Sequence, residues 1–434
     1  MRLHSTRDGS ITAGLGEAIA RGLAPDGGLY VPDVLPRLDV DALARAGSLA
    51  DVATGLVRPF ADGDVMAPLV PAIAADAFDF PAPVVDVERS GAPLSVLELF
   101  HGPTAAFKDF GARFLAATLQ RLPSGDSRRL TILVATSGDT GGAVAAAFHG
   151  RPWVDVIVLY PRGLVSARQE KQLACWGGNV RTLSVRGTFD DCQRMVKEAF
   201  VDPALARDHR LSSANSINVG RLLPQMVYYA RASLELARRD GRPPNFIVPT
   251  GNLGNALACV WAREAGLPIG DIVLACNANA TIPEFLGGGE WHPRPSVATL
   301  ASAMDVGNPS NMERLLALYP DPATLRTKLR AERVDDEEIR RTISRDYGEL
   351  GQTWCPHTAT AAAAWRRLPA ARRAERWVLV ATAHPAKFND VVEPLIGAEV
   401  PVPPSLARLL VLPSIQRVVD PHLDALRCVV EEAA

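Results

Sequence analysis

The chain has 434 residues, of which 47% are hydrophobic, and 46 basic against 48 acidic side chains give a net charge of −2. This length and apolar content can bury a large core in two or three domains. The small net charge provides no general attraction to nucleic acid or to acidic membrane surfaces, so we expect neither as a partner. No apolar run approaches the roughly 20 residues of a membrane helix, and the opening residues lack a signal-peptide core, which favours a cytoplasmic protein.

Six cysteines are scattered along the chain with no C-x-x-C pair. Closely spaced cysteines are typical of zinc sites and of disulfide frameworks, so this pattern predicts neither. We therefore expect no metal site and interpret the cysteines as small core residues.

The order of the predicted elements indicates an α/β fold. Residues 1–80 contain the turn "APDGGLYVP" and several prolines, and they are interpreted as an N-terminal subdomain. Beyond them, apolar β-branched runs alternate with Ala-, Leu- and Arg-rich helical stretches; the runs cover residues 130–136, 154–160, 245–250, 271–276 and 377–382. Such runs predict parallel strands buried on both faces. The charged segment 321–346 is expected to form surface helices outside the core.

A single lysine, Lys108, lies in the stretch "FHGPTAAFKDFGARF", where a helix is expected to begin. With Thr104 as N-cap, the pattern predicts Phe107, Phe110 and Phe114 on one helical face and Lys108 at the end of the first turn. The helix macrodipole and the aromatic neighbours both disfavour a cation, so the amine should lose its proton more easily than in water. The alternative is a surface lysine whose stem packs on Phe107. Lysine is rare here, five among 46 basic residues, and arginine cannot supply an attacking amine.

Two predicted strands run into glycine-rich turns that are followed by helices. The first, "LTILVATSGDTGGAVAAAF", turns over residues 136–142, and the second, "NFIVPTGNLGNALA", turns over residues 249–255. Glycines permit close backbone approach and a helix N-terminus offers free N–H groups, so each loop is a candidate anion site. An ordinary tight connection is the alternative. Neither loop has the spacing of a Walker or dinucleotide motif, which disfavours a kinase or a dehydrogenase.

A third segment, "WVLVATAHPAKF", places Thr382 near the carboxyl end of a strand, where ligands of open α/β sheets bind. A hydroxyl group there can hydrogen-bond a ring nitrogen. The segment also contains Lys387, a rival nucleophile. Pro385 before it and charged residues after it predict a helix start with an exposed ammonium group, so Lys108 is the preferred candidate.

A reactive lysine, two anion sites and a strand-end hydroxyl are together the set that pyridoxal phosphate requires. The ordered motifs "FHGPTAAFKDFGARF", "TSGDTGGAVAAAF", "NSINVGRLLPQMVYY", "VPTGNLGNALA", "ASAMDVGNPSNMERL" and "TAHPAKF" resemble those of threonine synthases, pyridoxal-phosphate enzymes of the tryptophan-synthase-β type. The opening "GLAPDGGLYVP" is similar to their N-terminal subdomain, so the resemblance covers about residues 1–400.

The resemblance implies an α/β fold with two open, mostly parallel sheet domains plus an N-terminal subdomain. The expected boundaries are residues 1–80 for the threonine-synthase subdomain, 81–114 and 226–434 for a large pyridoxal-phosphate domain, and 115–225 for a small domain inserted in it. Closure of one domain on the other is expected to exclude water during the reaction.

The resemblance also implies roles for individual residues. Lys108 would form the Schiff base and act as the catalytic base, and Thr382 would meet the pyridine nitrogen. The cofactor phosphate would be held by a loop consisting of Gly251, Asn252, Leu253, Gly254 and Asn255. The substrate would be bound by Thr104, Ser137, Thr140, Asn218 and Arg221, with Arg221 on its phosphate. In related enzymes an asparagine often stands where Asp139 stands and touches the ring oxygen, so Asp139 belongs to the cofactor site without a defined role.

The implied reaction converts O-phospho-L-homoserine and water to L-threonine and phosphate by γ-elimination and β-addition of water. The expected partner is thus a small molecule, bound by a monomer or a dimer. Another pyridoxal-phosphate amino-acid lyase or dehydratase would share Lys108, the phosphate loop and Thr382. A non-catalytic ligand-binding homologue is a second alternative, expected to lack the lysine or the loop. The segments "FHGPT" and "SINVGR" favour phosphohomoserine.

Overall fold

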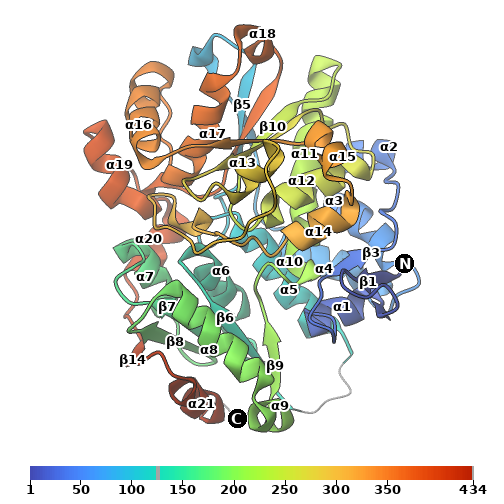
Figure 1. Ribbon diagram of the computed structural model, residues 1–434, viewed down its shortest axis with the longest axis vertical. Helices are drawn as coiled ribbons and strands as arrows, with labels where there is room; N and C mark the ends of the chain where they lie inside the picture. The colour runs from blue at the N-terminus through green and yellow to red at the C-terminus, as the bar shows by residue number, and fades with distance from the viewer. Residues whose placement is uncertain (124–127, 433–434) are drawn as a thin grey trace.

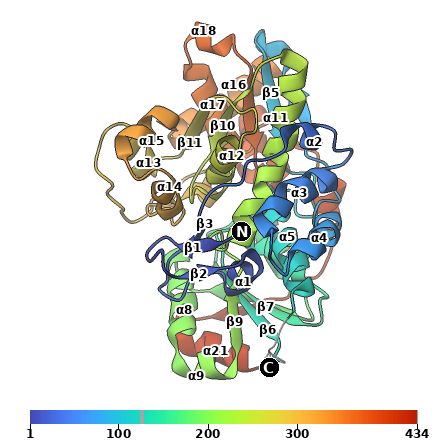
Figure 2. The same ribbon diagram turned by 90° about the vertical axis from the view of Figure 1, so that its right-hand side faces the viewer.

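The computed structural model describes residues 1–123 and 128–432, and it contains three β-sheets (Figure 1). The first is a small antiparallel sheet near the N-terminus, with strand order β2-β1-β3. Its strands are β1 (Leu3–Ser5), β2 (Thr12–Ala13) and β3 (Tyr30–Pro32). In the chain, α1 (Leu15–Arg21) lies between β2 and β3, and β3 is followed by α2 (Val40–Ala44), α3 (Leu49–Val57) and α4 (Val70–Ala77). Helix α4 packs on α5 (Lys108–Arg121), which joins this region to the rest of the molecule (Figure 2).

The second sheet has six strands in the order β12-β11-β10-β13-β5-β4, and all neighbours are parallel except β4 and β5. Its strands are β4 (Val84–Asp86), β5 (Leu94–Glu98), β10 (Asn245–Pro249), β11 (Ile272–Cys276), β12 (Arg330–Arg333) and β13 (Trp377–Ala381). In β10, Phe246 and Val248 belong to one core cluster and Ile247 to another. The sheet is therefore buried on both faces, with α12 (Gly254–Glu264) and α17 (Pro356–Arg367) packing on β10.

The third sheet has five parallel strands in the order β14-β8-β7-β6-β9. Its strands are β6 (Leu130–Ala135), β7 (Val154–Pro161), β8 (Val180–Val185), β9 (Arg210–Ser213) and β14 (Arg417–Val419). The assignment of the whole range 226–434 to the large domain is wrong for β14, which crosses over and pairs with β8. The cause is a C-terminal segment whose helix α21 (Leu423–Glu431) packs against α8 (Phe189–Val201).

The prediction for the charged segment 321–346 is also wrong in part. It does form α15 (Pro322–Lys328) and the beginning of α16 (Asp336–Leu350), but the residues between them form β12, the edge strand of the six-stranded sheet. Strand β12 is half-buried or exposed along its length, so its sequence is charged and lacks the apolar run that marks a central strand.

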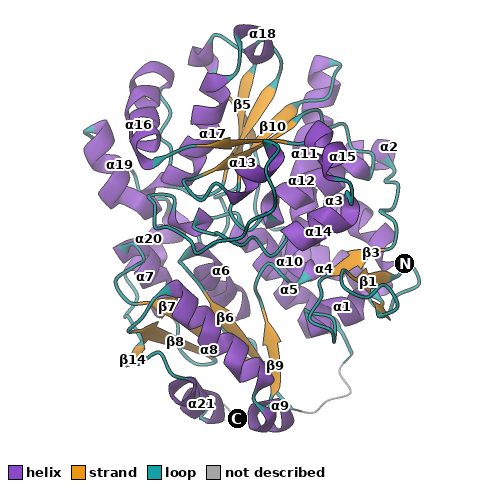
Figure 3. Ribbon diagram, in the orientation of Figure 1, coloured by secondary structure: helices purple, strands orange, loops and turns teal. Residues whose placement is uncertain are grey.

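The remaining helices pack on the sheets and on one another, and the colouring by secondary structure shows them around the strands (Figure 3). They are α6 (Asp139–Phe148), α7 (Ala167–Ala174), α9 (Pro203–Asp208), α10 (Val219–Leu222), α11 (Met226–Asp240), α13 (Thr281–Leu286), α14 (Met312–Leu318), α18 (Ala370–Arg373), α19 (Asn389–Ile396) and α20 (Pro404–Leu410). None of the helices found in residues 1–123 and 128–432 is both long and apolar enough to span a membrane. The fold class expected from the sequence, α/β with two mostly parallel sheets, is confirmed.

The two larger sheets lie at opposite ends of the molecule, and α5, α6 and α10 lie between them (Figure 1). Strands β5, β13 and β10 are parallel neighbours, so their carboxyl ends meet at one edge of the six-stranded sheet. The loops that leave these strands carry three of the predicted site segments: the approach to Lys108, Thr382, and Gly251 to Asn255.

Candidate active site

Lys108 is the first residue of α5, with Phe107 at the N-cap position. The prediction of Thr104 as N-cap is therefore wrong: its hydroxyl and its backbone N–H both donate to the buried Asp109 carboxylate, at 2.7 and 2.9 Å. Such a pairing turns the chain before the helix begins. Lys108 consequently projects from the positive end of the helix dipole, not from the end of its first turn.

The Lys108 amine lies 4.4 Å from the centre of the Phe107 ring. Burial, followed by the positive charge of Arg221, lowers the pKa of this amine to about 8, against the raising effect of the Asp139 carboxylate. Within the described residues the amine has no hydrogen bond or ion pair. A lysine with a lowered pKa and no partner is suited to act as a nucleophile or as a base.

Thr382 is tied directly to the segment that carries Lys108. The backbone N–H of Phe107 donates to the Thr382 carbonyl at 2.8 Å, and the N–H of His384 donates to the Ala105 carbonyl at 3.0 Å. These bonds form a short antiparallel bridge between the two loops. The Thr382 hydroxyl has no protein partner among the described residues and is 5% exposed as a residue. It is thus a free hydroxyl group at the edge of the sheet, as the sequence predicted.

The loop from Gly251 to Asn255 links β10 to α12. Leu253 has a positive φ of 62°, which turns the chain sharply into the helix that begins at Gly254. A Cβ atom on Gly251 would lie 2.7 Å from the backbone of Met304, so this position requires glycine. The unpaired N–H groups at the start of α12 face the turn, which makes the loop a possible anion site.

Two side chains anchor this loop. Asn252 donates to the Ser216 hydroxyl at 2.7 Å, so its amide is used to hold the loop in place. Asn255 accepts hydrogen bonds from Tyr228 and Tyr229 at 2.6 and 2.7 Å. Its buried Nδ2 atom has no partner in the described structure. A buried amide donor without an acceptor indicates a place for an oxygen-rich ligand.

The turn after β6 presents two free hydroxyl groups. Thr136 stabilises the turn, because its hydroxyl oxygen accepts hydrogen bonds from the backbone N–H groups of Gly138 and Gly141 at 3.0 and 2.9 Å. Ser137 and Thr140 are half-buried, and neither hydroxyl has a partner in the described parts of the chain. Asp139, the first residue of α6, is buried beside them.

Arg221 is buried in α10, and its Nη1 atom donates to the Ala214 carbonyl while its Nε atom has no partner in the described structure. Arg221 packs closely on α5. A Cβ atom added to Gly111 of α5 would lie 2.7 Å from the Arg221 carbonyl oxygen and 3.0 Å from the Arg221 Nε atom. Burial lowers the pKa of Arg221 to about 10. A buried guanidinium with a free N–H near Lys108 suits an anionic ligand.

The Asn218 side-chain amide forms two hydrogen bonds within the protein. Its side-chain oxygen caps α10 by accepting the N–H of Gly220 at 2.8 Å, and its Nδ2 donates to the Ile19 carbonyl at 2.9 Å. Asn218 therefore orients the helix that carries Arg221 and joins it to α1.

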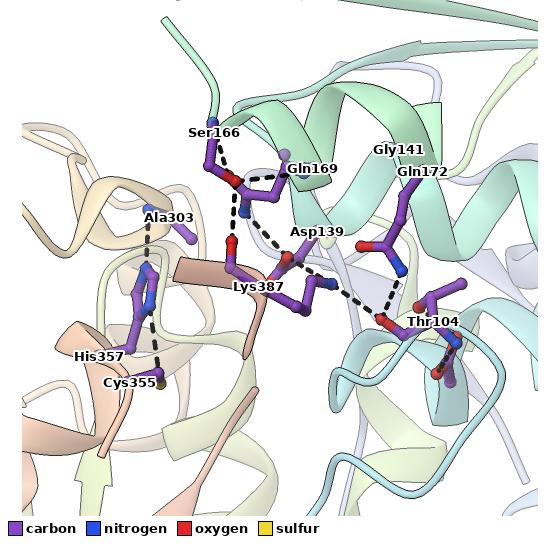
Figure 4. Close-up of polar contacts among 12 residues, drawn as sticks. Thr104, Asp139, Gly141, Ser166, Gln169, Gln172, Ala303, Cys355, His357 and Lys387 are labelled. Atoms are coloured by element: carbon purple, nitrogen blue, oxygen red, sulfur yellow. Dashed lines mark hydrogen bonds and ion pairs between the residues drawn. The ribbon is translucent and has the colours of Figure 1, made fainter. Parts of the chain in front are cut away.

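The prediction of an exposed Lys387 is wrong. Lys387 is 0% exposed, and its ammonium group contacts the Asp139 carboxylate at 2.8 Å and the Thr104 carbonyl at 2.9 Å (Figure 4). The sequence pattern did predict the local structure, a 3₁₀ turn η6 (Pro385–Phe388). The contacts come from segments more than 200 residues earlier: besides Asp139 and Thr104, Ser166 at the N-cap of α7 donates to the Lys387 carbonyl at 2.8 Å.

Two further polar residues of the site carried no signal in the sequence. Gln169 donates to Asp139 at 3.0 Å (Figure 4). His357 is buried and its Nε2 accepts the N–H of Ala303 at 3.1 Å (Figure 4), while burial lowers the pKa of the imidazole to about 4. His357 is therefore neutral near pH 7. Among the described residues, no group of three or more His, Cys, Asp or Glu could hold a metal ion.

These groups match what pyridoxal phosphate needs. The free Lys108 amine can hold the carbonyl carbon, the unpaired Asn255 Nδ2 and the α12 N-terminus can hold a phosphate, and the free Thr382 hydroxyl can meet a ring nitrogen. The chemistry of these groups therefore fits the cofactor.

Comparison with known proteins supports this interpretation. Residues 77–383 match the family of pyridoxal-phosphate dependent enzymes, residues 2–78 match the threonine synthase N terminus, and residues 358–430 match the threonine synthase C-terminal family. Threonine synthase of Escherichia coli is 39% identical over 430 residues, covering 98% of both chains, and that of Saccharomyces cerevisiae is 34% identical, covering 89% of this chain and 88% of the yeast protein.

Solved structures agree with the sequence comparison. The crystal structure of threonine synthase from Escherichia coli superposes with a TM-score of 0.91 at 38% identity and covers 100% of both chains. The structure of pyridoxal-phosphate-bound threonine synthase from Brucella melitensis has a TM-score of 0.90 at 34% identity, covering 100% of this chain and 99% of that one. The resemblance seen in the motifs is confirmed, and the chain belongs to the threonine synthase family of pyridoxal-phosphate-dependent lyases.

Proposed function

We propose that this protein converts O-phospho-L-homoserine and water to L-threonine and phosphate. The observation that carries the proposal is the Lys108 amine: it begins α5, its pKa is lowered to about 8, and no described side chain pairs with it. Full-length similarity to threonine synthases selects this substrate from those of other pyridoxal-phosphate enzymes.

Three parts of the chain would hold the cofactor. Lys108 would bind it through its amine, the loop from Gly251 to Asn255 would bind its phosphate, and Thr382 would face its ring nitrogen. When bound, the cofactor withdraws electrons from the substrate carbons, so that protons can leave positions that normally retain them. The Thr382 hydroxyl can meet a ring nitrogen without requiring that nitrogen to carry a proton.

Lys108 would also move the protons of the reaction. As a neutral amine it can accept a proton from the substrate Cα. Once it has released that proton to water or to another base in the site, it is neutral again and can accept one from Cβ before phosphate leaves from Cγ. An amine with a pKa of about 8 exchanges protons readily near neutral pH, because neither its charged nor its neutral form is strongly disfavoured.

The substrate would bind on the side of the turn after β6. Ser137 and Thr140 have free hydroxyl groups there, and Arg221 has a free buried N–H for the substrate phosphate. A guanidinium placed before the substrate arrives both orients the phosphate and stabilises its departure as an anion. Thr104 and Asn218 are assigned to positioning instead, because their side chains are bonded to Asp109 and to Gly220 and Ile19.

The test is to incubate the purified protein with O-phospho-L-homoserine and to measure phosphate release and threonine formation together. Equal amounts of both products, with cofactor trapped on Lys108 by borohydride and located by mass spectrometry, are expected. Lys108→Ala should lose both activities while its circular dichroism stays unchanged. Lys197→Ala, which removes an exposed lysine of α8, is the matched control and should stay fully active.

Trapping without turnover would contradict the proposed substrate and would favour another amino-acid lyase or dehydratase. A Lys108→Ala protein with full activity would contradict the assignment of the catalytic lysine. Neither result depends on the other, because the borohydride step does not require substrate.

A further inference from the structure

Lys387 joins three separate parts of the active site. Its ammonium group lies 2.8 Å from Asp139 at the start of α6 and 2.9 Å from the Thr104 carbonyl in the loop that leads to Lys108 (Figure 4). The Lys387 backbone comes from η6, five residues after Thr382. Gln172 of α7 donates to the same Thr104 carbonyl at 2.9 Å. Lys387 is therefore held by buried contacts from several elements, unlike a lysine in an ion pair at the surface.

Burial of an ammonium group requires a partner, and here the partner is also close to Lys108. Asp139 is buried, and its negative charge opposes the lowering of the pKa values of Lys108 and His357 that burial causes. Its Oδ1 atom accepts from Lys387 at 2.8 Å and from Gln169 at 3.0 Å. Two amines thus lie within electrostatic range of one carboxylate, and only Lys387 is paired with it in the described structure.

Without Lys387, the Asp139 carboxylate would attract the Lys108 amine. At short range in a buried site this attraction is strong, and a lysine paired with a carboxylate keeps its proton to higher pH. Such a lysine is a poor nucleophile, because only the neutral amine attacks a carbonyl carbon.

We propose that Lys387 is a positioning residue that occupies the Asp139 carboxylate, so that this carboxylate does not pair with Lys108. Lys387 thereby leaves the Lys108 amine free for the cofactor and for proton transfer. The inference deepens the proposed function and rests on it for its catalytic meaning, although the arrangement of charges exists in the chain alone. It also gives Asp139 a role: the carboxylate is held on the small-domain side of the site as a hydrogen-bond acceptor.

The charged and titratable groups that act on this pair come from every neighbouring element. They are Lys108 and Asp109 of α5, Arg221 of α10, Cys355 and His357 at the start of α17, and His384 next to η6. These residues are the same in all the variants considered, so a difference between variants originates from the change at Lys387 or Asp139.

The experiment measures the protonation of Lys108 in the full-length, cofactor-free protein. Trace labelling with acetic anhydride from pH 6 to 10, quantified for each lysine by mass spectrometry, gives the labelling midpoint of Lys108. The chain has only five lysines, and exposed Lys197 serves as an internal reference. The variants are Lys387→Met, Lys387→Arg, and the double variant Asp139→Asn with Lys387→Met.

The wild-type midpoint for Lys108 is expected near pH 8. In Lys387→Met it should move upward by about one unit or more, which lowers labelling at pH 7 about tenfold. Lys387→Arg keeps the charge and should keep the wild-type midpoint. The double variant removes both charges of the pair, and its midpoint should return to the wild-type value or below. A purely structural role for Lys387 would not predict this return.

An unchanged or lowered midpoint in Lys387→Met would overturn the inference, and so would a double variant that behaves like the single one. If Lys387→Met fails to fold, Lys387→Gln provides the same test, because it is neutral but retains a donor for Thr104. The labelling uses neither cofactor nor substrate. Shifted midpoints in a protein that makes no threonine would therefore support the inference while refuting the proposed function.

Discussion

The substitution Gly251→Ala tests the proposed phosphate loop at a position where the structure leaves no room for a methyl group. The new Cβ would lie 2.7 Å from the Met304 Cα and 3.1 Å from its carbonyl carbon. Ordinary carbon contacts are about 3.5–4.0 Å, so a displacement of the order of 0.8 Å is required. Both partners are backbone, so no side-chain rotation can relieve the clash.

Overpacking of this kind costs about 1–3 kcal/mol. If the loop moves, the cost appears as weaker cofactor binding, and each 1.4 kcal/mol is about a tenfold increase in Kd. We expect Gly251→Ala to raise the Kd for pyridoxal phosphate about tenfold or more, as measured by absorbance titration. The cofactor-free protein should also unfold at lower urea concentration.

Gly348→Ala is the matched control, at a glycine of α16 that lies outside the loop. Its Cβ would meet no atom within 4 Å, and alanine is a better helix former than glycine. We expect an unchanged Kd and equal or greater stability. The reasoning would be refuted if the Gly251 and Gly348 variants bound the cofactor equally well and unfolded at the same urea concentration.

Three further predictions concern single side chains. Lys108→Met should raise the free energy of unfolding of the cofactor-free protein at pH 7, because the folded-state pKa of Lys108, about 8, lies below the ordinary lysine value. This gain in stability should fade as the pH rises from 8 through 10.5. An equal gain in stability at pH 11 would contradict the prediction. Arg221→Met should raise the KM for phosphohomoserine at least tenfold while leaving borohydride trapping of the cofactor intact; an unchanged KM would exclude this arginine as the phosphate ligand. Arg314→Lys should lower the free energy of unfolding by about 1–3 kcal/mol in urea titration, because the buried guanidinium bonds the Tyr30 carbonyl at 3.0 Å and Asn311 at 2.8 Å, and lysine cannot reach both; unchanged stability would contradict this.

The sequence predicted those parts of the fold and site that depend on local pattern. The strands at β6, β7, β10, β11 and β13 are apolar runs, and the structure confirms all five. Lys108 was identifiable because the aromatic neighbours and the helix dipole both disfavour a charged amine at a helix start, so a lysine at this position indicates a function. The free Thr382 hydroxyl followed from its place after a buried strand.

The parts that were not predicted depend on contacts between distant segments. Lys387 lies in a 3₁₀ turn whose local pattern predicts a surface position. It is buried, and its contacts come from distant segments: Asp139 and the Thr104 carbonyl bond its ammonium group, and Ser166 bonds its backbone carbonyl. Strand β14 has three residues and becomes a strand only by pairing with β8. No pattern within either segment carries this information.

The backbone provides a final argument that the site is formed by the chain itself. Among the described residues, only Ala105 and Leu253 combine a side chain with a positive φ, at 54° and 62°. Such conformations persist only where the surroundings enforce them, and they cluster at functional sites. Ala105 is held by the bridge to His384, and Leu253 by its buried side chain. Ala105 lies three residues before Lys108, and Leu253 lies within the proposed phosphate loop. The two segments that would bind the cofactor are therefore held in strained conformations by protein contacts alone.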